Sequence, residues 1–206
     1  EILDEPLPED PELFCVTHAV WQYAKGIAYA VLGNIDTALE QQQLLRKAVG
    51  ALPEDRIVFQ NDARDILAVA GPMLAGELEY RRGNYDIAFS HLRKAVELYD
   101  DLNYSEPWSW MMPPRHALGA LLLEQNYVDE ATAVYRADLG LDDTLVRPSQ
   151  HPDNIWSLVG YAECCERSGD LKTLEEIRPE LEKARGIADH SIDVSCFCRI
   201  GHACCD

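Results

Sequence analysis

The last twelve residues, SCFCRIGHACCD, hold four of the seven cysteines and one of the six histidines of the chain. Cys196 and Cys198 are two residues apart, so in an extended segment their side chains share one face. Together with His202 and with Cys204 or Cys205, they could furnish three or four soft ligands for Zn²⁺ or Cu⁺. The tail is therefore a candidate metal site, although it lacks the paired C-x2-C motifs that are usual for zinc.

The same thiols could instead form disulfides or pack as small apolar side chains. Cys164 and Cys165 are candidates for a bond to the tail, because the helical segment that contains them directly precedes it. Neighbours in a helix point about 100° apart, so these two cannot converge on one metal, and one of them is expected in the core. An odd cysteine count also leaves one thiol for an intermolecular contact. The residues leave all of these alternatives open.

The elements that must position these residues repeat along the chain. Four segments align: KGIAYAVLGNIDTALE, AGELEYRRGNYDIAFS, LGALLLEQNYVDEATA and YAECCERSGDLKTLEE. Each has a small residue, a Gly or Asn seven positions later, and an Ala or Leu five positions after that. These positions are Gly26, Gly33 and Ala38; Gly76, Gly83 and Ala88; Gly119, Asn126 and Ala131; and Ala162, Gly169 and Leu174.

This spacing predicts helical hairpins. The small residue lets the first helix approach the second closely, and the Gly or Asn supplies a left-handed residue at the turn. The pattern resembles the tetratricopeptide repeat (TPR), which predicts an all-α solenoid of about four hairpins. We expect the hairpins near residues 15–52, 62–102, 112–140 and 153–188, within a repeat domain over 15–190. Residues 1–14 are an acidic lead-in, and 191–206 are a Cys-rich tail.

Extra sequence lies between the hairpins, because the turn residues are 50, 43 and 43 positions apart and not about 34 as in a regular TPR. LPEDRIVFQNDARDILAVAGPM is predicted to lengthen the second helix of hairpin one and the first helix of hairpin two. NYSEPWSWMMPPRHALG and VRPSQHPDNIWSLVG are predicted loops, because their prolines interrupt a helix. Trp108, Trp110 and Trp156 predict that these loops pack against the helices.

Helix positions that would face the concave wall of such a stack are the candidate partner-binding groove. They are Tyr23, Met73, Glu77, Tyr80, His116, Trp156 and Glu163. Because Glu77 and Glu163 would repel a carboxylate, the sequence predicts an apolar or basic peptide as the ligand.

Arg115, His151 and Asn154 are candidates for a pocket between the two Pro-rich loops, beside His116. The competing interpretation is purely structural: residues 115–116 begin a helix, and HPDN is a turn whose Asp153 or Asn154 caps the next one. The sequence predicts no catalytic residue. Asn103, in Asn-Tyr-Ser, would be a glycosylation acceptor only in a secreted protein.

The charge balance excludes some partners. The 206 residues include 18 Lys and Arg against 36 Asp and Glu, a net charge of −18. Such a chain repels phosphate backbones and anionic lipid surfaces, so neither nucleic acid nor membrane is an expected partner. The chain has no initiator Met and no signal-like start, so we expect a processed protein or part of a longer one.

Several stretches resemble the C-terminal part of a family of long, largely uncharacterised bacterial and fungal TPR proteins. They are EPLPEDPELFCVTHAVWQYAKGIAYA, GELEYRRGNYDIAFSHLRKAVELYD, PPRHALGALLLEQNYVDEATAVYRADLG, HPDNIWSLVGYAECCERSGD and SCFCR. The resemblance implies a helical-repeat fold, a further repeat region upstream and a cytoplasmic location, and it brings no activity. An extracellular location is the alternative if the tail is disulfide-bonded and Asn103 is glycosylated.

The leading hypothesis is a non-enzymatic scaffold that binds a protein or peptide, or that assembles with itself end to end into an oligomer or filament. No cofactor is expected under this hypothesis. The alternative is a metal-binding or redox protein that uses the tail, with Zn or Cu as the metal. A third hypothesis is an enzyme that combines His116 and His151 with residues of a missing upstream half.

Overall fold

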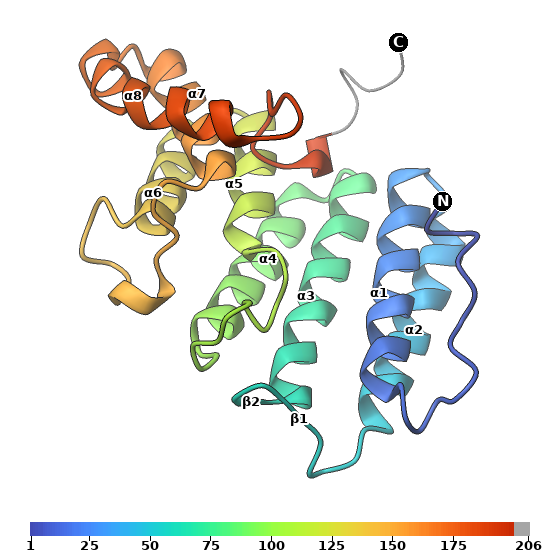
Figure 1. The fold of residues 1–206 in the computed structure, drawn as a ribbon. Helices are drawn as coiled ribbons and strands as arrows, with labels where there is room; N and C mark the ends of the chain where they lie inside the picture. Colours follow the sequence, from blue (N-terminus) through green and yellow to red (C-terminus); the bar gives the residue numbers. More distant parts are fainter. Residues whose placement is uncertain (200–206) are drawn as a thin grey trace. The chain divides into compact units, whose positions relative to one another are not determined.

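The computed structural model describes residues 1–199, and this part of the chain is mostly helical, with very little strand (Figure 1). Its helices are α1 (Cys15–Val31), α2 (Ile35–Gly50), α3 (Ala63–Arg81), α4 (Tyr85–Asp100), α5 (Pro114–Glu124), α6 (Val128–Leu139), α7 (Ile155–Ser168) and α8 (Leu171–Ile187). Two 3-10 turns, Arg147–Ser149 and Phe197–Arg199, and a hairpin of β1 (Ile57–Val58) and β2 (Asn61–Asp62) complete it. The all-α class is confirmed. Among these described helices, none is long and apolar enough to cross a membrane.

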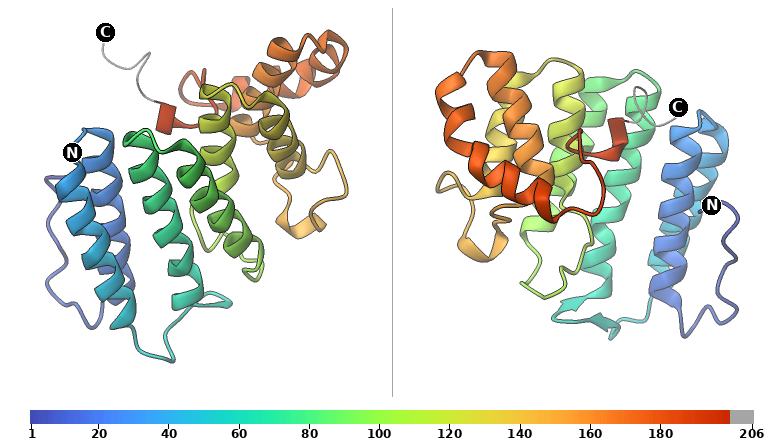
Figure 2. Two further views of the ribbon diagram at one scale, coloured as in Figure 1. Left: turned by 180° about the vertical axis from the view of Figure 1, so that it is seen from behind. Right: turned by 45° about the horizontal axis from the view of Figure 1, so that its top comes forward.

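The chain forms two compact units, Glu1–Pro114 and Arg115 onward. The boundary falls inside the range 15–190 that the sequence predicts as one repeat domain. In the first unit, α1 pairs with α2 and α3 pairs with α4, and α3 packs against both helices of the preceding pair (Figure 2). Gly26 permits this packing, since a Cβ there would lie 2.7 Å from Leu74 Cδ2.

The acidic lead-in is attached to α1 by side chains of that helix. The Lys25 ammonium donates to the Leu3 carbonyl at 2.8 Å, and the His18 ring bonds the Pro8 carbonyl at 2.7 Å. In the second unit, α7 packs against both α6 and α8. The fully buried Tyr135 of α6 lies against Gly119 of α5 and Gly160 of α7.

The four predicted turns share one geometry. Gly33, Gly83, Asn126 and Gly169 all have positive φ, between 64° and 79°. The residue after each turn donates its N–H to the carbonyl five positions back, at 2.9 Å in every case: Asn34 to Tyr29, Asn84 to Glu79, Tyr127 to Leu122 and Asp170 to Cys165. This is the Schellman arrangement that ends many helices. The left-handed turn residues expected from the sequence are therefore confirmed.

Replacing Gly83 with alanine tests this turn geometry without a packing change. Gly83 has φ +79°, and a Cβ there would meet nothing within 4 Å. We expect Gly83→Ala to lower the free energy of unfolding by about 1 kcal/mol, because an L-residue is strained in this region. Gly83→Asn should lose less. Gly50→Ala is the matched control, with ordinary helical φ and open space, and equal urea midpoints for Gly83→Ala and Gly50→Ala would contradict the prediction.

The segment between the first two hairpins differs from the prediction. It does not lengthen α2, which ends at Gly50, three residues before Pro53; a proline disfavours the helical conformation at the residue before it. It forms a loop with the short β-hairpin, and Asn61 ties this loop to the backbone of Asn103 by bonds of 2.7 and 2.8 Å. The segment does contribute to α3, which begins at Ala63 with the Asp62 side chain accepting from the Arg64 N–H.

The three tryptophans of the predicted loops have different environments. Trp110 is buried and meets Tyr23 edge to face, with ring centroids 5.1 Å apart, whereas Trp108 is partly exposed. Trp156 does not lie in a loop, because α7 begins at Ile155. The helix starts there because the Asn154 side chain caps it, accepting from the Ser157 N–H at 2.9 Å.

Candidate functional site

The most concentrated group of polar side chains in the second unit surrounds Asp138, whose side chain is fully buried. One carboxylate oxygen accepts from the His151 Nδ1–H at 2.7 Å. The other accepts from Ser157 Oγ at 2.6 Å, Asn154 Nδ2 at 3.0 Å and His116 Nε2 at 3.2 Å. Because an ionised carboxylate only accepts, both histidine nitrogens must carry the hydrogen. We call these five residues the Asp138 cluster.

Four elements supply the cluster. His116 comes from α5, Asp138 from α6, His151 from the loop, and Asn154 with Ser157 from the start of α7. The main chain is joined at the same place, because the His151 N–H donates to the Asp138 carbonyl at 2.6 Å. Asn154 also donates to the His151 carbonyl at 2.6 Å. The cluster therefore fastens the loop between α6 and α7 onto both helices.

Burial and hydrogen bonding act in opposite directions on Asp138. Burial raises the pKa of the carboxyl, but hydrogen bonds from His116 and His151, together with their charges, lower it further than burial raises it. The net effect holds the pKa of Asp138 below its ordinary value. The site thus contains a buried carboxylate whose charge is compensated by its donors.

The arrangement is that of a positioning network. His116, His151 and Ser157 are buried together with Asp138. The Ser157 hydroxyl donates to the Asp138 carboxylate, so it takes part in the network that holds this carboxylate. Within residues 1–199, no three or more His, Cys, Asp or Glu side chains are grouped so that they could hold a metal ion.

The two hypotheses for the Pro-rich loops meet at this cluster. The structure brings His116, His151 and Asn154 together, but around a buried carboxylate, and Asn154 is also the helix cap of the structural interpretation. Arg115 is buried, and its charge contributes to the lowered pKa of Asp142, on which hydrogen bonding by Thr144 is the larger influence.

Sequence reasoning missed Asp138 and Ser157. The available signal was an acidic residue between the apolar residues Ala137 and Leu139, both of which are buried, as is Tyr135 one turn earlier. An aspartate that must be buried with such neighbours needs donors from other elements. The sequence alone does not say which elements those are.

The predicted groove residues of the first unit mostly serve its interior. Met73, Glu77 and Tyr80 are at most 7% exposed. Glu77 accepts from Arg81 Nε at 2.7 Å, and Tyr80 packs against Phe89. Tyr23 packs on Trp110, as described above, and burial raises the pKa of the Tyr23 hydroxyl. These side chains are therefore held by their own unit.

The predicted groove residues of α7 contact the tail. The ring of Trp156 meets that of Phe197 edge to face, with centroids 5.1 Å apart. Glu163 accepts from Arg199 Nη1 at 2.7 Å and from Nη2 at 3.3 Å. The Ser195 hydroxyl bonds the Tyr135 hydroxyl at 2.5 Å.

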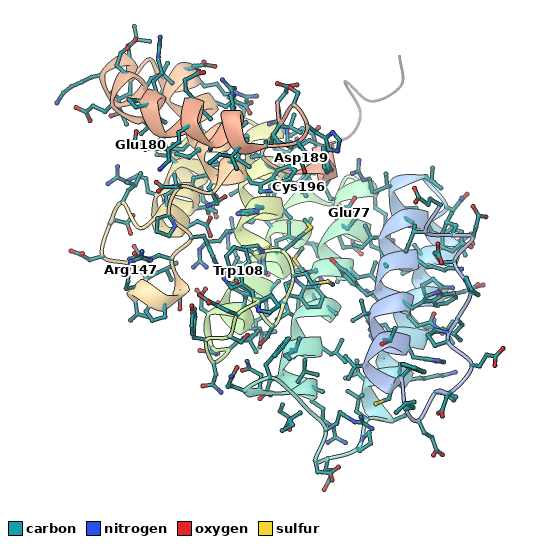
Figure 3. All side chains as sticks on the ribbon, in the orientation of Figure 1. Glu77, Trp108, Arg147, Glu180, Asp189 and Cys196 are labelled. Carbon is teal, nitrogen blue, oxygen red and sulfur yellow. A yellow bond between two sulfur atoms is a disulfide. The ribbon has the colours of Figure 1, made fainter. Side chains whose placement is uncertain are left out.

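The cysteines take two forms in the described chain. Cys196, labelled in Figure 3, and Cys198 form a disulfide. Cys164 and Cys165 are buried free thiols, so the alternative of a bond from either of them to Cys196 or Cys198 is not formed. The remaining predicted ligands of the tail, His202, Cys204 and Cys205, lie outside the described residues.

Alkylation should separate these cysteines by rate. In the unreduced folded protein we expect iodoacetamide to label partly exposed Cys15 first. Cys164 and Cys165 should react only on unfolding, since burial raises the pKa of Cys164 to about 11 and less thiolate is present. Cys196 and Cys198 should need a reductant. Peptide mass spectrometry measures each site, and labelling of Cys196 before reduction would contradict this order.

The glycosylation motif lies in an ordered loop. Asn103 Nδ2 donates to the Gln60 carbonyl at 3.1 Å, while the Ser105 hydroxyl is buried and bonds Ser109 Oγ at 2.6 Å. Glycosylation of Asn103 stays a prediction.

The described residues define the class as an all-α protein. No protein-family model, curated protein or solved structure matches the chain.

Proposed function

We propose that this chain is a TPR-like helical-repeat protein that acts by binding another protein and not by catalysis. The observation that carries the proposal is the identical geometry of the four hairpin turns, each with a left-handed residue and a 2.9 Å bond spanning five positions. This helix end is common and also closes α6 at Gly140, but the four turns share in addition a fixed offset of seven positions from a small residue. Unrelated helices have no reason to keep that offset. Repeats of this kind expose extended surfaces that commonly bind proteins.

The electrostatics of the chain favour a basic or apolar partner. A net charge of −18 speeds association with positively charged proteins and disfavours acidic ones. The best-connected polar group, the Asp138 cluster, is buried, so it supports the fold more readily than it supports a reaction.

Partner capture followed by reconstitution tests this function. The full chain with an N-terminal tag is used to enrich proteins from its own cells, with an acidic helical protein of similar charge as the control. Each specifically enriched protein is then purified and titrated calorimetrically against the chain. We expect at least one direct, saturable complex, and the proposal fails if none of the enriched proteins binds the purified chain.

Self-assembly is the narrower version of the same function. Sedimentation velocity over a range of concentrations, with and without reductant, measures it. A sedimentation coefficient that rises with concentration supports assembly into oligomers or filaments. A monomer under all conditions would contradict self-assembly.

A redox role for the tail is the second candidate function, and the Cys196–Cys198 disulfide favours it. Elemental analysis of the untagged full chain distinguishes it from the metal hypothesis. Stoichiometric Zn or Cu would favour metal binding, whereas intact disulfide without metal favours redox chemistry.

A further inference from the structure

The tail returns to the helices of its own unit. After α8 ends at Ile187, the chain turns back (Figure 1). Its alternate residues Ser195, Phe197 and Arg199 then contact side chains of α6 and α7. Three different kinds of interaction are made: a hydroxyl–hydroxyl bond, an aromatic contact and a two-point ion pair. We call residues 195–199 the tail segment.

The tail segment contacts Tyr135 of α6 and Trp156 and Glu163 of α7. We call these three residues the α7 face. Glu163 is held in place from its own helix, because it accepts from Arg167 Nη2 at 2.5 Å. Glu124 adds a second negative charge, which acts on Arg199 in the same direction as Glu163. The face therefore offers a hydroxyl, an aromatic ring and a carboxylate in a fixed order, matched to a polar, an aromatic and a cationic side chain.

The tail segment is only partly buried on this surface. Phe197 remains 50% exposed, although Ser195 and Cys196 are buried. A pocket of about 450 Å³ is lined by α7 and α8 and, on the side of the tail, by Asp193, Val194 and Arg199. The Arg199–Glu163 ion pair is more covered, with side chains 15% and 22% exposed. Half of the Phe197 surface thus stays in contact with solvent, and this part of the segment is the one a competitor can reach.

We propose that the α7 face is a binding site for a peptide with an aromatic residue followed two positions later by arginine, and that the tail segment occupies this site in cis. The partner must then displace Phe197 and Arg199, so the tail sets the threshold for binding. This inference rests on the proposed function and names the partner chemistry and its regulation. Charge supports it, because Glu163 with Glu124 favours a cationic ligand.

A labelled copy of the tail is the probe. The peptide is fluorescein-DVSCFCR, residues 193–199 with its two cysteines oxidised, and binding is followed by fluorescence anisotropy. The receptor is the full chain carrying Phe197→Ala and Arg199→Ala, with the fold checked by circular dichroism. We expect at least tenfold tighter binding to this variant than to the wild type, because the wild-type tail already occupies the face.

Matched changes locate the binding. Adding Glu163→Gln to the receptor should weaken binding at least tenfold, whereas Glu180→Gln, exposed on α8 away from the pocket beside the tail, should not. A peptide with alanine in place of its phenylalanine and arginine should bind neither receptor. Equal affinity of the folded variant and the wild type, or equal affinity of the two peptides, overturns the proposal.

A second measurement uses the wild-type chain and so does not depend on the variant folding. Excess unlabelled peptide should increase hydrogen exchange in residues 194–199 as it displaces them, and unchanged exchange at saturation overturns displacement. If a partner protein binds directly but the peptide does not, only this inference fails. If the peptide binds the α7 face but no partner protein exists, the proposed function fails and the cis contact is a structural clasp.

Discussion

Replacing Asp138 with asparagine is expected to lower the free energy of unfolding by about 3–5 kcal/mol, the usual cost of breaking a buried ionic network. Asparagine has the shape of aspartate but no charge. Its amide NH2 group would face side chains that themselves donate hydrogen bonds. His116, His151 and Ser157 would compete for one remaining acceptor oxygen in a buried site. Urea unfolding followed by circular dichroism measures the loss.

Asp143→Asn is the matched control, because Asp143 is exposed in the loop after α6. It makes the same chemical change and should alter stability by less than about 0.5 kcal/mol. Similar stability of the Asp138 and Asp143 variants would show that the cluster contributes little to the fold, and the buried carboxylate would then need another explanation.

Acid should reveal the same network. The pKa of Asp138 is lower in the folded than in the unfolded chain. In an unfolded chain the pKa of an aspartate is about 3.9. Because its pKa is lowered by folding, the ionised Asp138 stabilises the fold at pH values above the pKa that it has in the unfolded chain. This contribution is lost as the pH falls through the pKa that Asp138 has in the folded chain. The wild type should therefore lose stability from about pH 4 downwards, while Asp138→Asn should lose less over the same interval. Parallel pH profiles would contradict this assignment.

Local features of the fold were predictable because they depend on few neighbours in sequence. A left-handed residue at Gly33 or Asn126 follows from the chemistry of a helix end, and the close approach at Gly26 follows from the absence of a side chain. The end of α2 was missed although Pro53 marks it, because the helical periodicity before it was extended too far.

The site was less predictable because its geometry depends on segments far apart in the chain. His116 and Asp138 are 22 residues apart, and Tyr135 and Ser195 are 60 apart. One sequence shows that His116 and His151 lie at helix starts, but it does not show which carboxylate they share. Similarly, Trp156 and Glu163 were expected to face a partner, and the tail that contacts them became visible only in three dimensions.

The packing of Tyr135 explains a glycine that the repeat pattern did not single out. The pattern assigns the small position of hairpin four to Ala162, but Gly160 is the residue that lies against Tyr135. Gly119, which the pattern did identify, lies against the same ring, where a Cβ would be 2.5 Å from Cζ. The ring of Tyr135 on α6 thus lies against one glycine of α5 and one glycine of α7. Its size limits how closely each of these two helices approaches α6.

Gly160→Ala should therefore destabilise the protein by about 1–3 kcal/mol, the usual cost of overpacking a core. A Cβ at this position would lie 2.6 Å from both Cε2 and the hydroxyl oxygen of Tyr135. The direction of this change in stability is informative, because alanine normally stabilises a helix interior relative to glycine by about 0.5–1 kcal/mol. Gly186→Ala, in α8 with nothing within 4 Å, is the control and should be neutral or stabilising.

A double-mutant cycle with Tyr135→Leu identifies the cause of the Gly160 effect. Leucine removes the ring atoms that the new methyl group would meet, so Gly160→Ala should cost much less in the Tyr135→Leu background than in the wild type. The coupling between the two sites should be about 1 kcal/mol or more, within the range seen for residues in contact. If the cost of Gly160→Ala is the same in both backgrounds, the clash with Tyr135 is not its origin, and the spacing of α6 and α7 is set by other contacts.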